Sequence, residues 1–270
     1  MSIKNLLCTI GLSAMLLTSG AAMADVIVTN PAGVFSNNGP SNAMGPGFAA
    51  DTWFANNVRA GGSVGITGTY AHAGNGSLAF AGPANANAKA DFEYYFSTAN
   101  QFRLSDLSAL SYDWLRAASS TASGHYHPAL RLSVTDGTRS GYLVYEGVYN
   151  GQTVAPVGSW TSVDVIGTAG QQKIWATGSL PDSFSNYNRT AADWAALLPG
   201  LTVTGLSIGI GSGWDGSFAG AVDLVSYTVA GTTTTFNFET RALAVPEPSS
   251  MALIGVGLAG LAFVRRRKAG

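Results

Sequence analysis

The feature that most constrains the fold of this chain is a series of short runs in which apolar and polar residues alternate. In the run from Asp91 to Phe96, the aromatic side chains of Phe92, Tyr94 and Phe96 occupy every second position. Successive side chains of a β-strand point to opposite faces, so this spacing predicts a strand with one buried face. Similar runs recur at residues 130–134, 163–165, 206–210, 221–229 and 233–238. Such runs, separated by Gly, Asn, Asp and Pro, predict an all-β fold, an antiparallel sandwich or barrel.

One segment departs from the alternating pattern. Residues 190–198 read TAADWAALL, in which Thr190 is a candidate helix N-cap and Asp193 follows three residues later. A Pro-Gly pair directly after the segment stops a helix. We therefore expect one short helix packed on the β-structure. Its apolar face would consist of Trp194, Leu197 and Leu198.

The N-terminus has the three zones of a secretory signal peptide. A basic residue, Lys4, is followed by an apolar run and then by the small-residue tripeptide AMA that ends at Ala24. This order predicts a signal peptide over residues 1–24, cleaved between Ala24 and Asp25; a retained membrane anchor is the alternative. The one cysteine of the chain, Cys8, lies inside this segment, so no disulfide can form in the exported body.

The C-terminus carries a second apolar segment, which is short for a membrane span. Residues 251–264 are all apolar or glycine. At about 1.5 Å per residue they would span about 21 Å of helix, against a hydrocarbon core of ~30 Å. The pattern predicts a short transmembrane helix over residues 251–270 after a linker at 242–250; a helix of a soluble core is the alternative. The basic residues that close it, and that would stay cytoplasmic, are Arg265, Arg266, Arg267 and Lys268.

The tripeptide Pro246-Glu247-Pro248 precedes this segment. A PEP tripeptide followed by a short apolar run and terminal arginines resembles the PEP-CTERM sorting signal of Gram-negative bacteria. The resemblance implies a transient membrane anchor that an exosortase-type peptidase processes, in organisms that make exopolysaccharide. It also implies that this peptidase recognises Pro246, Glu247 and Pro248, with the basic cluster as stop-transfer charges. The protein would then remain at the cell surface or be released outside the cell.

Charged side chains are scarce, and outside the two terminal segments they are mostly acidic. They make up 11% of the chain, against about 25% in typical globular proteins. Five of the 14 Lys and Arg residues lie in the terminal segments, so residues 25–248 hold nine against all 15 Asp and Glu, a formal charge of −6. An acidic body argues against nucleic acid as a partner, because phosphate binding needs a basic face.

Two stretches of the body resemble jelly-roll modules of extracellular proteins, which include carbohydrate-binding and laminin-B-like domains. One is Leu206–Glu239, where a Gly/Trp/Asp loop leads into a strand with the sequence VDL around Asp223; the other is GNGSL around Asn75. The resemblance implies one jelly-roll-like β-sandwich domain over residues 25–241. It also implies a structural calcium ion at Asp223, with Asn75 near the loop. Calcium takes about six to eight oxygen ligands, and the alternative is an aspartate that is hydrogen-bonded within its strand.

Two pairs of ionisable residues invite a chemical interpretation. His125 and His127 lie two residues apart, as in a metal site, but zinc needs about four ligands and the body holds one other histidine, His72. Asp91 and Glu93 also share a strand face, as the two carboxylates of a glycosidase could. No G-x-S-x-G, H-E-x-x-H or phosphate-binding glycine motif accompanies them. We expect a loop-edge histidine pair and no catalysis.

Aromatic residues beside glycine- or serine-rich stretches are stronger functional candidates, because aromatic faces stack on sugar rings. Most tryptophans of a sandwich are nonetheless core residues. We favour Trp214 with Asp215, which lie in a glycine loop, as the ligand site. The aromatic residues expected at the surface are Trp53, Trp160, Trp175, Trp214, Tyr142, Tyr145 and Tyr149.

The sequence therefore predicts an exported, non-catalytic structural or carbohydrate-binding component of an exopolysaccharide matrix. Its partners would be the sorting peptidase, the polysaccharide and, through the C-terminal segment, the membrane for a time. The alternative is a surface enzyme that cleaves polysaccharide.

Overall fold

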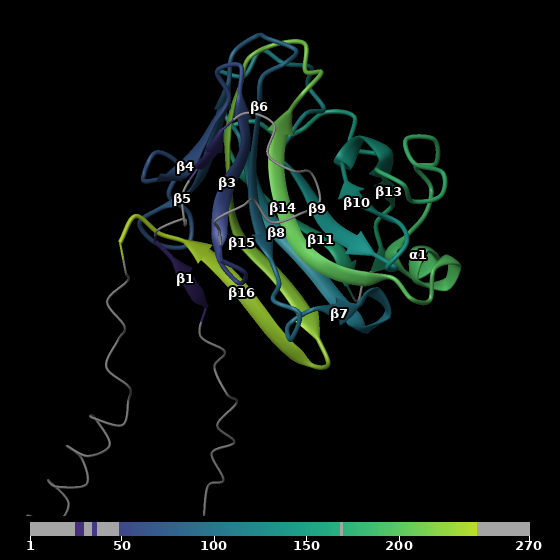
Figure 1. The fold of residues 1–270 in the computed structure, drawn as a ribbon. Coiled ribbons are helices and arrows are strands. Elements are labelled where there is room, and N and C mark those ends of the chain that lie inside the picture. The colour runs from purple at the N-terminus through teal and green to yellow at the C-terminus, as the bar shows by residue number, and fades with distance from the viewer. Residues whose placement is uncertain (1–24, 30–33, 37–48, 168–169, 242–270) are drawn as a thin grey trace, which may run out of the picture.

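The alternating runs form strands, and the strands form two sheets packed face to face (Figure 1). This computed structural model describes residues 25–29, 34–36, 49–167 and 170–241. The all-β antiparallel sandwich expected from the alternating runs is confirmed. The predicted signal peptide, the PEP tripeptide and the predicted transmembrane helix lie outside the described residues.

The first sheet brings the two ends of the described chain together. Its order is β1 (Val26–Val28), β16 (Thr232–Phe238), β15 (Phe218–Val229), β8 (Leu107–Arg116), β11 (Trp160–Gly167) and β12 (Gly170–Gln171). β5 (Ser77–Gly82) pairs with β15, and β4 (Ser63–Thr67) pairs with β5. All of these pairs are antiparallel except β1 with β16, which lie side by side in parallel (Figure 1).

The second sheet positions the candidate site. Its order is β13 (Ile174–Ala176), β10 (Ser140–Tyr145), β9 (Ala129–Thr135), β14 (Thr202–Gly211), β6 (Lys89–Tyr95), β3 (Trp53–Arg59) and β2 (Val34–Ser36), and β7 (Phe102–Arg103) pairs with β14. Here too one edge pair, β2 with β3, is parallel. The sandwich is therefore antiparallel throughout its middle, with one parallel addition in each sheet.

One hydrophobic core fills the space between the sheets. Phe92 on β6, Ile208 on β14 and Leu132 on β9 point inward from the second sheet, and Trp114 and Phe238 meet them from the first; none is more than 1% exposed. Each large apolar side chain buried in this way stabilises the fold by about 1.5–3 kcal/mol. Because their neighbours in each strand point outward, the same alternation that makes the core also makes an outer face.

The expectation that Trp53 and Tyr145 lie at the surface is wrong. Trp53 is 3% exposed and stacks on Phe92, with the ring centroids 5.3 Å apart. It pairs across β3 and β6 with Tyr94, which also belongs to the inward face. Tyr145, at the end of β10, is likewise part of the core. Proximity to glycine-rich stretches did not predict which face of its strand each aromatic side chain occupies, because the pairing register of the strands determines that face.

The predicted helix is present as α1 (Ala191–Leu197). Thr190 caps it: its hydroxyl accepts from the backbone N–H of Asp193, whose carboxylate accepts from the backbone N–H of Thr190. Trp194 is fully buried, and its Nε1 donates to the carbonyl of Ile174 at 2.9 Å. The predicted apolar face is wrong at Leu197, which is 44% exposed, because the helix packs through Trp194 and the residue one turn later, Leu198. Two 3₁₀ turns, Leu104–Asp106 and Gly147–Asn150, complete the helical elements described.

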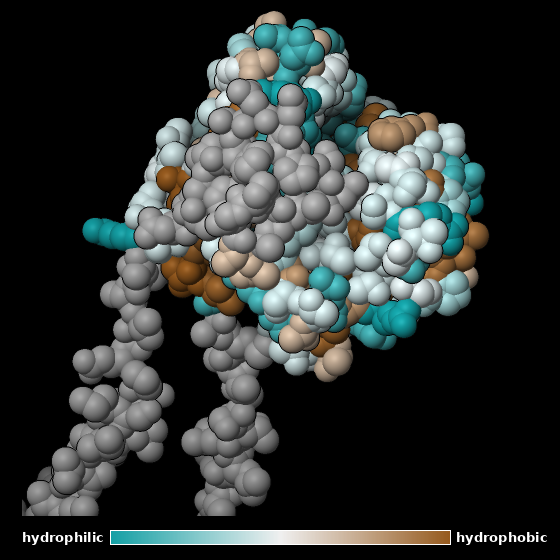
Figure 2. Space-filling model, viewed as in Figure 1, coloured by the Kyte–Doolittle hydropathy of each residue, from teal (hydrophilic) through white to brown (hydrophobic). Residues whose placement is uncertain are grey.

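The face of the sandwich drawn in Figure 2 shows little continuous hydrophobic area among the coloured residues. In Figure 2 hydrophobic residues form separate patches on a mainly white and teal surface. Among the described residues, no helix has both the length and the apolar character needed to cross a membrane. Within the described ranges, the exposed large hydrophobic residues are Val26, Ile27, Val154, Val157, Phe184 and Leu197.

Candidate functional site

The outer face of the second sheet carries a groove with a volume of about 520 Å³. Its floor crosses the middle strands β6, β14 and β9, where outward-facing residues alternate with core residues: Asp91 precedes Phe92, and Arg131 lies between Leu130 and Leu132. The groove is lined by Asn57, Lys89, Asp91, Arg131, Tyr142, Val144, Glu146, Trp175, Thr177, Gly178, Phe184, Gly211, Ser212 and Trp214.

A group of charged residues centred on Asp91 forms the floor. Asp91 accepts from Nη1 of Arg131 at 2.7 Å and from Nζ of Lys89 at 2.9 Å, and Nδ2 of Asn57 donates to it at 3.2 Å. Burial by itself would raise the pKa of Asp91, but the charges of Arg131 and Lys89 outweigh burial and hold that pKa below its usual value. Asp91 is therefore ionised, and two cations share one carboxylate.

A glycine makes room for this arrangement. Gly209 on β14 lies opposite Asp91, between the strands that carry Asp91 and Arg131. A Cβ atom at Gly209 would lie 2.0 Å from Oδ1 of Asp91 and 2.8 Å from Nη1 of Arg131. On β14, Gly209 therefore leaves space at the floor of the groove. Leu206, Ile208 and Ile210, at the alternate positions, point into the core.

Glu93 lies beneath this floor and is fully buried. Its Oε1 accepts from the hydroxyls of Tyr142 at 2.7 Å and Ser207 at 3.0 Å, and its Oε2 accepts from Nδ2 of Asn56 at 2.7 Å and from the hydroxyl of Tyr95 at 3.2 Å. Burial, together with the nearby charge of Asp91, raises the pKa of Glu93. Each oxygen of this carboxyl thus has two partners within the protein, so Glu93 holds strands together and is not free to meet a ligand.

Aromatic residues stand on both sides of the charged floor. On one side Trp175 packs against Phe184, with ring centroids 5.5 Å apart, and its Nε1 donates to Oε2 of Glu146 at 3.1 Å. On the other side Trp214 stacks on Tyr126 at 4.7 Å with the planes only 12° apart. The hydrogen bond of Trp175 and the ring stacking of Trp214 restrict the rotation of these side chains, so they form fixed walls.

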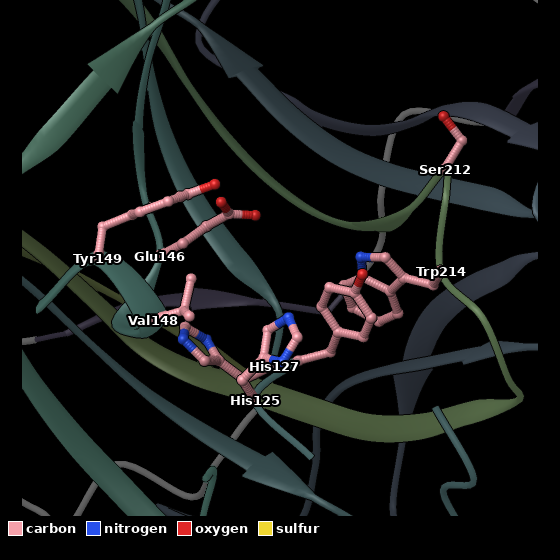
Figure 3. Close-up of a pocket in the computed structure, with 8 residues that line it drawn as sticks. His125, His127, Glu146, Val148, Tyr149, Ser212 and Trp214 are labelled. Atoms are coloured by element: carbon pink, nitrogen blue, oxygen red, sulfur yellow. The ribbon is translucent and has the colours of Figure 1, made fainter. Parts of the chain in front are cut away.

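A second cavity of about 240 Å³ adjoins the groove, with Glu146, Ser212 and Trp214 lining both. Figure 3 shows Glu146 projecting into it from the side opposite Trp214, with Tyr149 beside Glu146. Burial raises the pKa of Glu146. The two cavities therefore form a longer binding surface with a polar end.

His127 belongs to the wall of this second cavity, and both of its ring nitrogens are bonded within the protein. Its Nε2 accepts from the backbone N–H of Gly147 at 2.9 Å, and its Nδ1 donates to the carbonyl of Pro128 at 2.9 Å. Burial lowers the pKa of His127 to about 4, so the ring is neutral near pH 7. His125 and His127 line the same cavity but lie in the loop before β9 and not on a strand. Across the described ranges, no cluster of three or more His, Cys, Asp or Glu residues could hold a metal ion.

Of the pair predicted to bind a ligand, the structure places only Trp214 in the groove. Asp215 accepts from the backbone N–H of Ser123 at 2.8 Å, and the hydroxyl of Ser123 donates to the same carboxylate. Asp215 thus ties two loops together and does not line either cavity. Trp160, on the first sheet, stacks on His72 at 4.2 Å, away from both cavities.

The two residues considered for calcium lie at the first sheet, Asp223 on β15 and Asn75 in the loop before β5. Asp223 is fully buried; its Oδ1 accepts from the backbone N–H groups of Leu224 and Phe238, and its Oδ2 accepts from that of Ala73. These bonds accompany a bulge in β15, where Leu224 adopts a φ of 49° and the simple alternation ends. Burial raises the pKa of Asp223. Asp223 therefore has the bonding expected of a strand aspartate, and the calcium interpretation stays a prediction.

Glu239, which sequence reasoning did not single out, adds to that prediction. It is fully buried, and its Oε2 accepts from the backbone N–H of Asn75 at 2.5 Å. Its Oε1 and Oδ1 of the buried Asn237 have no hydrogen-bond partner within the described part of the chain. Unpartnered buried oxygens are costly, and oxygens are the ligands that calcium prefers. We therefore add the oxygens of Asn237 and Glu239 to the calcium prediction as candidate ligands.

Sequence reasoning also did not assign a role to Lys89, Arg131 or Glu146. A signal for Arg131 was present, because a charged residue between Leu130 and Leu132 must lie on the outer face of its strand. What the sequence could not show is that β9 and β6 lie on either side of β14, which brings Arg131 to Asp91.

Comparison with known proteins confirms the sorting signal. Residues 244–268 match the PEP-CTERM protein-sorting motif. A search of the curated proteins finds no match.

Among solved structures, the chain is similar to a family 11 carbohydrate-binding module from Clostridium thermocellum in complex with a beta-1,3-1,4-mixed-linked tetrasaccharide (9% identity, 73% of this chain and 94% of that chain, TM-score 0.38). It is also similar to the cellulose induced protein Cip1 (17% identity, 64% and 87% of the chains, TM-score 0.34). A third similar structure is a beta-1,2-glucanase from Parabacteroides distasonis (16% identity, 63% and 22% of the chains, TM-score 0.34).

Proposed function

We propose that this exported, PEP-CTERM-sorted protein binds a glycan chain, without cleaving it, in the groove on the outer face of the second sheet. The observation that carries the proposal is the pairing of fixed aromatic walls, Trp175 and Trp214, with a polar floor at Asp91 and Arg131. Sugar rings present apolar faces to aromatic side chains and hydroxyls to charged and amide groups. The groove volume of about 520 Å³ also falls in the range of about 300–1,000 Å³ that is usual for small-ligand sites.

The sorting signal supports a setting outside the cell for this binding. In the proposal, residues 251–270 anchor the chain in the membrane for a time, and an exosortase-type peptidase processes it near Pro246, Glu247 and Pro248. The sandwich then becomes a structural component of an exopolysaccharide matrix. A surface with few charges and many hydroxyl and amide groups suits such a polymer-rich environment.

The alternative is a polysaccharide-cleaving enzyme, which would need two free carboxyl groups on either side of a glycosidic bond. Asp91 is held by Lys89 and Arg131, and both oxygens of Glu93 are bonded within the protein. Glu146 lines the groove, but one of its oxygens accepts from Trp175. These contacts favour binding over cleavage.

A pull-down on insoluble polysaccharides, combined with a reducing-sugar assay, tests the proposal on the full chain in mild detergent. We expect retention without sugar release. Trp175→Ala should weaken retention by about tenfold, because it removes a stacking face. Trp160→Ala is the matched control, since that tryptophan lies on the first sheet, and it should bind as the wild type does. Release of reducing sugar, or equal retention of Trp175→Ala and the wild type, would refute the proposal.

A further inference from the structure

We infer that the glycan bound by this protein carries free amino groups, as polymers of glucosamine do, and that an ammonium group of the glycan binds Oε1 of Glu146 in the smaller cavity of about 240 Å³. This inference rests on the proposed function, because it names the class of glycan for the same site. It follows from the bonding of Glu146, from the charges that line the smaller cavity and from the aromatic side chains around it.

Glu146 presents one carboxylate oxygen to the smaller cavity. Its Oε2 accepts from Nε1 of Trp175 at 3.1 Å, which fixes the orientation of the carboxyl group. Within the described residues, Oε1 has no hydrogen-bond partner, and it is not sealed from solvent. Figure 3 shows this carboxyl group projecting into the cavity. Oε1 is therefore available to a donor group of a ligand.

The charge of Glu146 has no counterion at close range. Lys89 and Arg131 both bond to Asp91, and no ion pair among the described residues includes Glu146. The described residues that line the smaller cavity include no lysine or arginine. His127, in the same lining, is neutral near pH 7, because burial lowers its pKa to about 4. The charges that line the larger groove balance, but the smaller cavity holds a carboxylate without a lysine or arginine beside it.

Burial of Glu146 increases what a cation gains by binding there. Burial raises the pKa of Glu146, because its ionised form is poorly solvated, and the charge of Arg131 acts against that rise. Arg131 lines the larger groove and not the smaller cavity, and its Nη1 donates to Asp91 at 2.7 Å. His125 does line the smaller cavity, and its ring competes with a cationic ligand only when it is protonated. An ammonium group at Oε1 would stabilise the ionised carboxylate, as an opposite charge within about 4–6 Å does.

Three aromatic side chains, those of Tyr126, Tyr149 and Trp214, line the smaller cavity with Glu146. Tyr126 stacks on Trp214 at 4.7 Å, and Tyr149 stacks on Tyr187 at 4.2 Å, so their positions are fixed. Burial and then the charge of Glu146 raise the pKa of Tyr149 to about 12, so its phenol is neutral near pH 7. In Figure 3, Tyr149 lies beside Glu146, and Trp214 lies across the cavity. Aromatic faces attract cations within about 6 Å of the ring centre, so this lining suits an ammonium group.

A neutral sugar hydroxyl is the alternative donor to Oε1. It would leave the charge of Glu146 unmatched, whereas a hydrogen bond between two charged groups is roughly twice as strong as one between neutral groups. The smaller cavity is also continuous with the larger groove, because Glu146, Ser212 and Trp214 line both. A glycan stacked on the wall at Trp175 would therefore bring the amino group of the same or the next unit to Glu146.

The test compares oligomers that differ in one substituent of each sugar unit. Titration calorimetry on the full chain in detergent, at neutral pH, would use glucosamine hexamers with β-1,4 and with β-1,6 linkages. Each is compared with the glucose hexamer of the same linkage, in which a hydroxyl replaces the amino group. We expect at least one glucosamine hexamer to bind about tenfold or more tightly than its glucose counterpart, since hydrogen bonds to charged groups are the stronger ones. Raising NaCl to about 0.5 M should reduce this preference.

Two variants separate the site at Glu146 from a general attraction. Glu146→Gln keeps the shape of the side chain and an acceptor for Trp175 but removes the charge, so it should abolish the preference; thermal unfolding shows whether the variant is folded. Asp106→Asn removes an exposed acid that lines neither cavity, and it should keep the preference. This control matters because the body, with a formal charge of −6, attracts cationic polymers in general.

Three outcomes would overturn the inference. If each glucose hexamer binds as tightly as its glucosamine counterpart, the amino group is not recognised, although glycan binding stands. If Glu146→Gln keeps the preference, or Asp106→Asn loses it to the same extent, the ammonium group does not bind at Glu146. If neither glucosamine hexamer binds while insoluble polysaccharide retains the protein, this inference fails alone; if no polysaccharide retains it either, the proposed function fails as well.

Discussion

Nη1 of Arg131 donates to Oδ1 of Asp91 at 2.7 Å, across the strand that lies between them. Asp91 is 2% and Arg131 9% exposed, so the pair is almost entirely removed from water. Removing one partner of such a pair costs about 3–5 kcal/mol, because the other charge is left buried and unpaired. The pair persists because Lys89 and Asn57 also bond to Asp91 and because Gly209 leaves space for it.

We expect Gly209→Ala to destabilise the protein by about 3 kcal/mol and to weaken glycan binding. The new methyl group would lie 2.0 Å from Oδ1 of Asp91, so the ion pair must separate or the strand must move. Denaturant unfolding measures the change. Gly65→Ala is the matched control, because a Cβ there meets nothing within 4 Å, and it should shift stability by no more than about 0.5 kcal/mol. Equal effects at the two glycines would contradict this account of the groove floor.

The buried His127 should make the protein less stable at mildly acidic pH. Burial lowers its pKa to about 4, against about 6.5 in an unfolded chain. The unfolded state therefore binds more protons between these values, and stability is lost as the pH falls from about 6.5 towards 4, by about 3 kcal/mol at the lower limit. Unfolding free energies measured from pH 7 to pH 5 would show the slope.

The comparison for this prediction is His127→Gln, which removes the titrating ring. The raised pKa values of Glu93 and Glu146 act with the opposite sign, because those acids contribute stability that is lost as the pH rises. Subtracting the variant from the wild type cancels their part. A difference that does not depend on pH would show that His127 is not the group responsible.

A calcium ion at Asn75 and Glu239 should be detectable in protein stripped with EDTA. We expect calorimetric heat on adding calcium and a higher unfolding temperature, since an ion that binds only the folded state stabilises it. Glu239→Gln should abolish both effects, because it removes the negative charge of a candidate ligand whose Oε1 has no partner within the described residues. Asp106→Asn, which changes an exposed acid elsewhere, should leave both intact. The absence of heat and of any thermal shift in the wild type would rule the ion out.

The sorting signal makes a prediction about the fate of the whole chain. Replacing Pro246, Glu247 and Pro248 by alanine should leave the full-length form in the inner membrane, because the processing peptidase no longer recognises it. Fractionation with an antibody against the sandwich would show the shift. If the processed form appears in the usual amount, the tripeptide is not the recognised element.

Two elements show most clearly which parts of the structure the sequence predicts. The alternation around Asp91 identified β6, and the Thr190 and Asp193 spacing identified α1, because each depends on residues close together in the chain. The same reasoning misplaced Trp53, since the face of a side chain depends on the neighbouring strands as well as on local composition. It selected Trp214 because that residue lies in a glycine loop, and Trp214 does line the groove. It could not predict that Asp215 is hydrogen-bonded to Ser123, which is far away in the sequence.

The sequence by itself determined the strand-forming runs, the helix with its cap and the sorting signal at 244–268. These are local patterns, set by the period of the strand, the geometry of a helix N-terminus and the order of a short motif. Only the tertiary structure decided that β9, β14 and β6 are neighbours, and hence that Arg131, Gly209 and Asp91 form one floor. The reason is physical: pairing between strands far apart in the chain is selected by burial of the whole core, which no single segment contains.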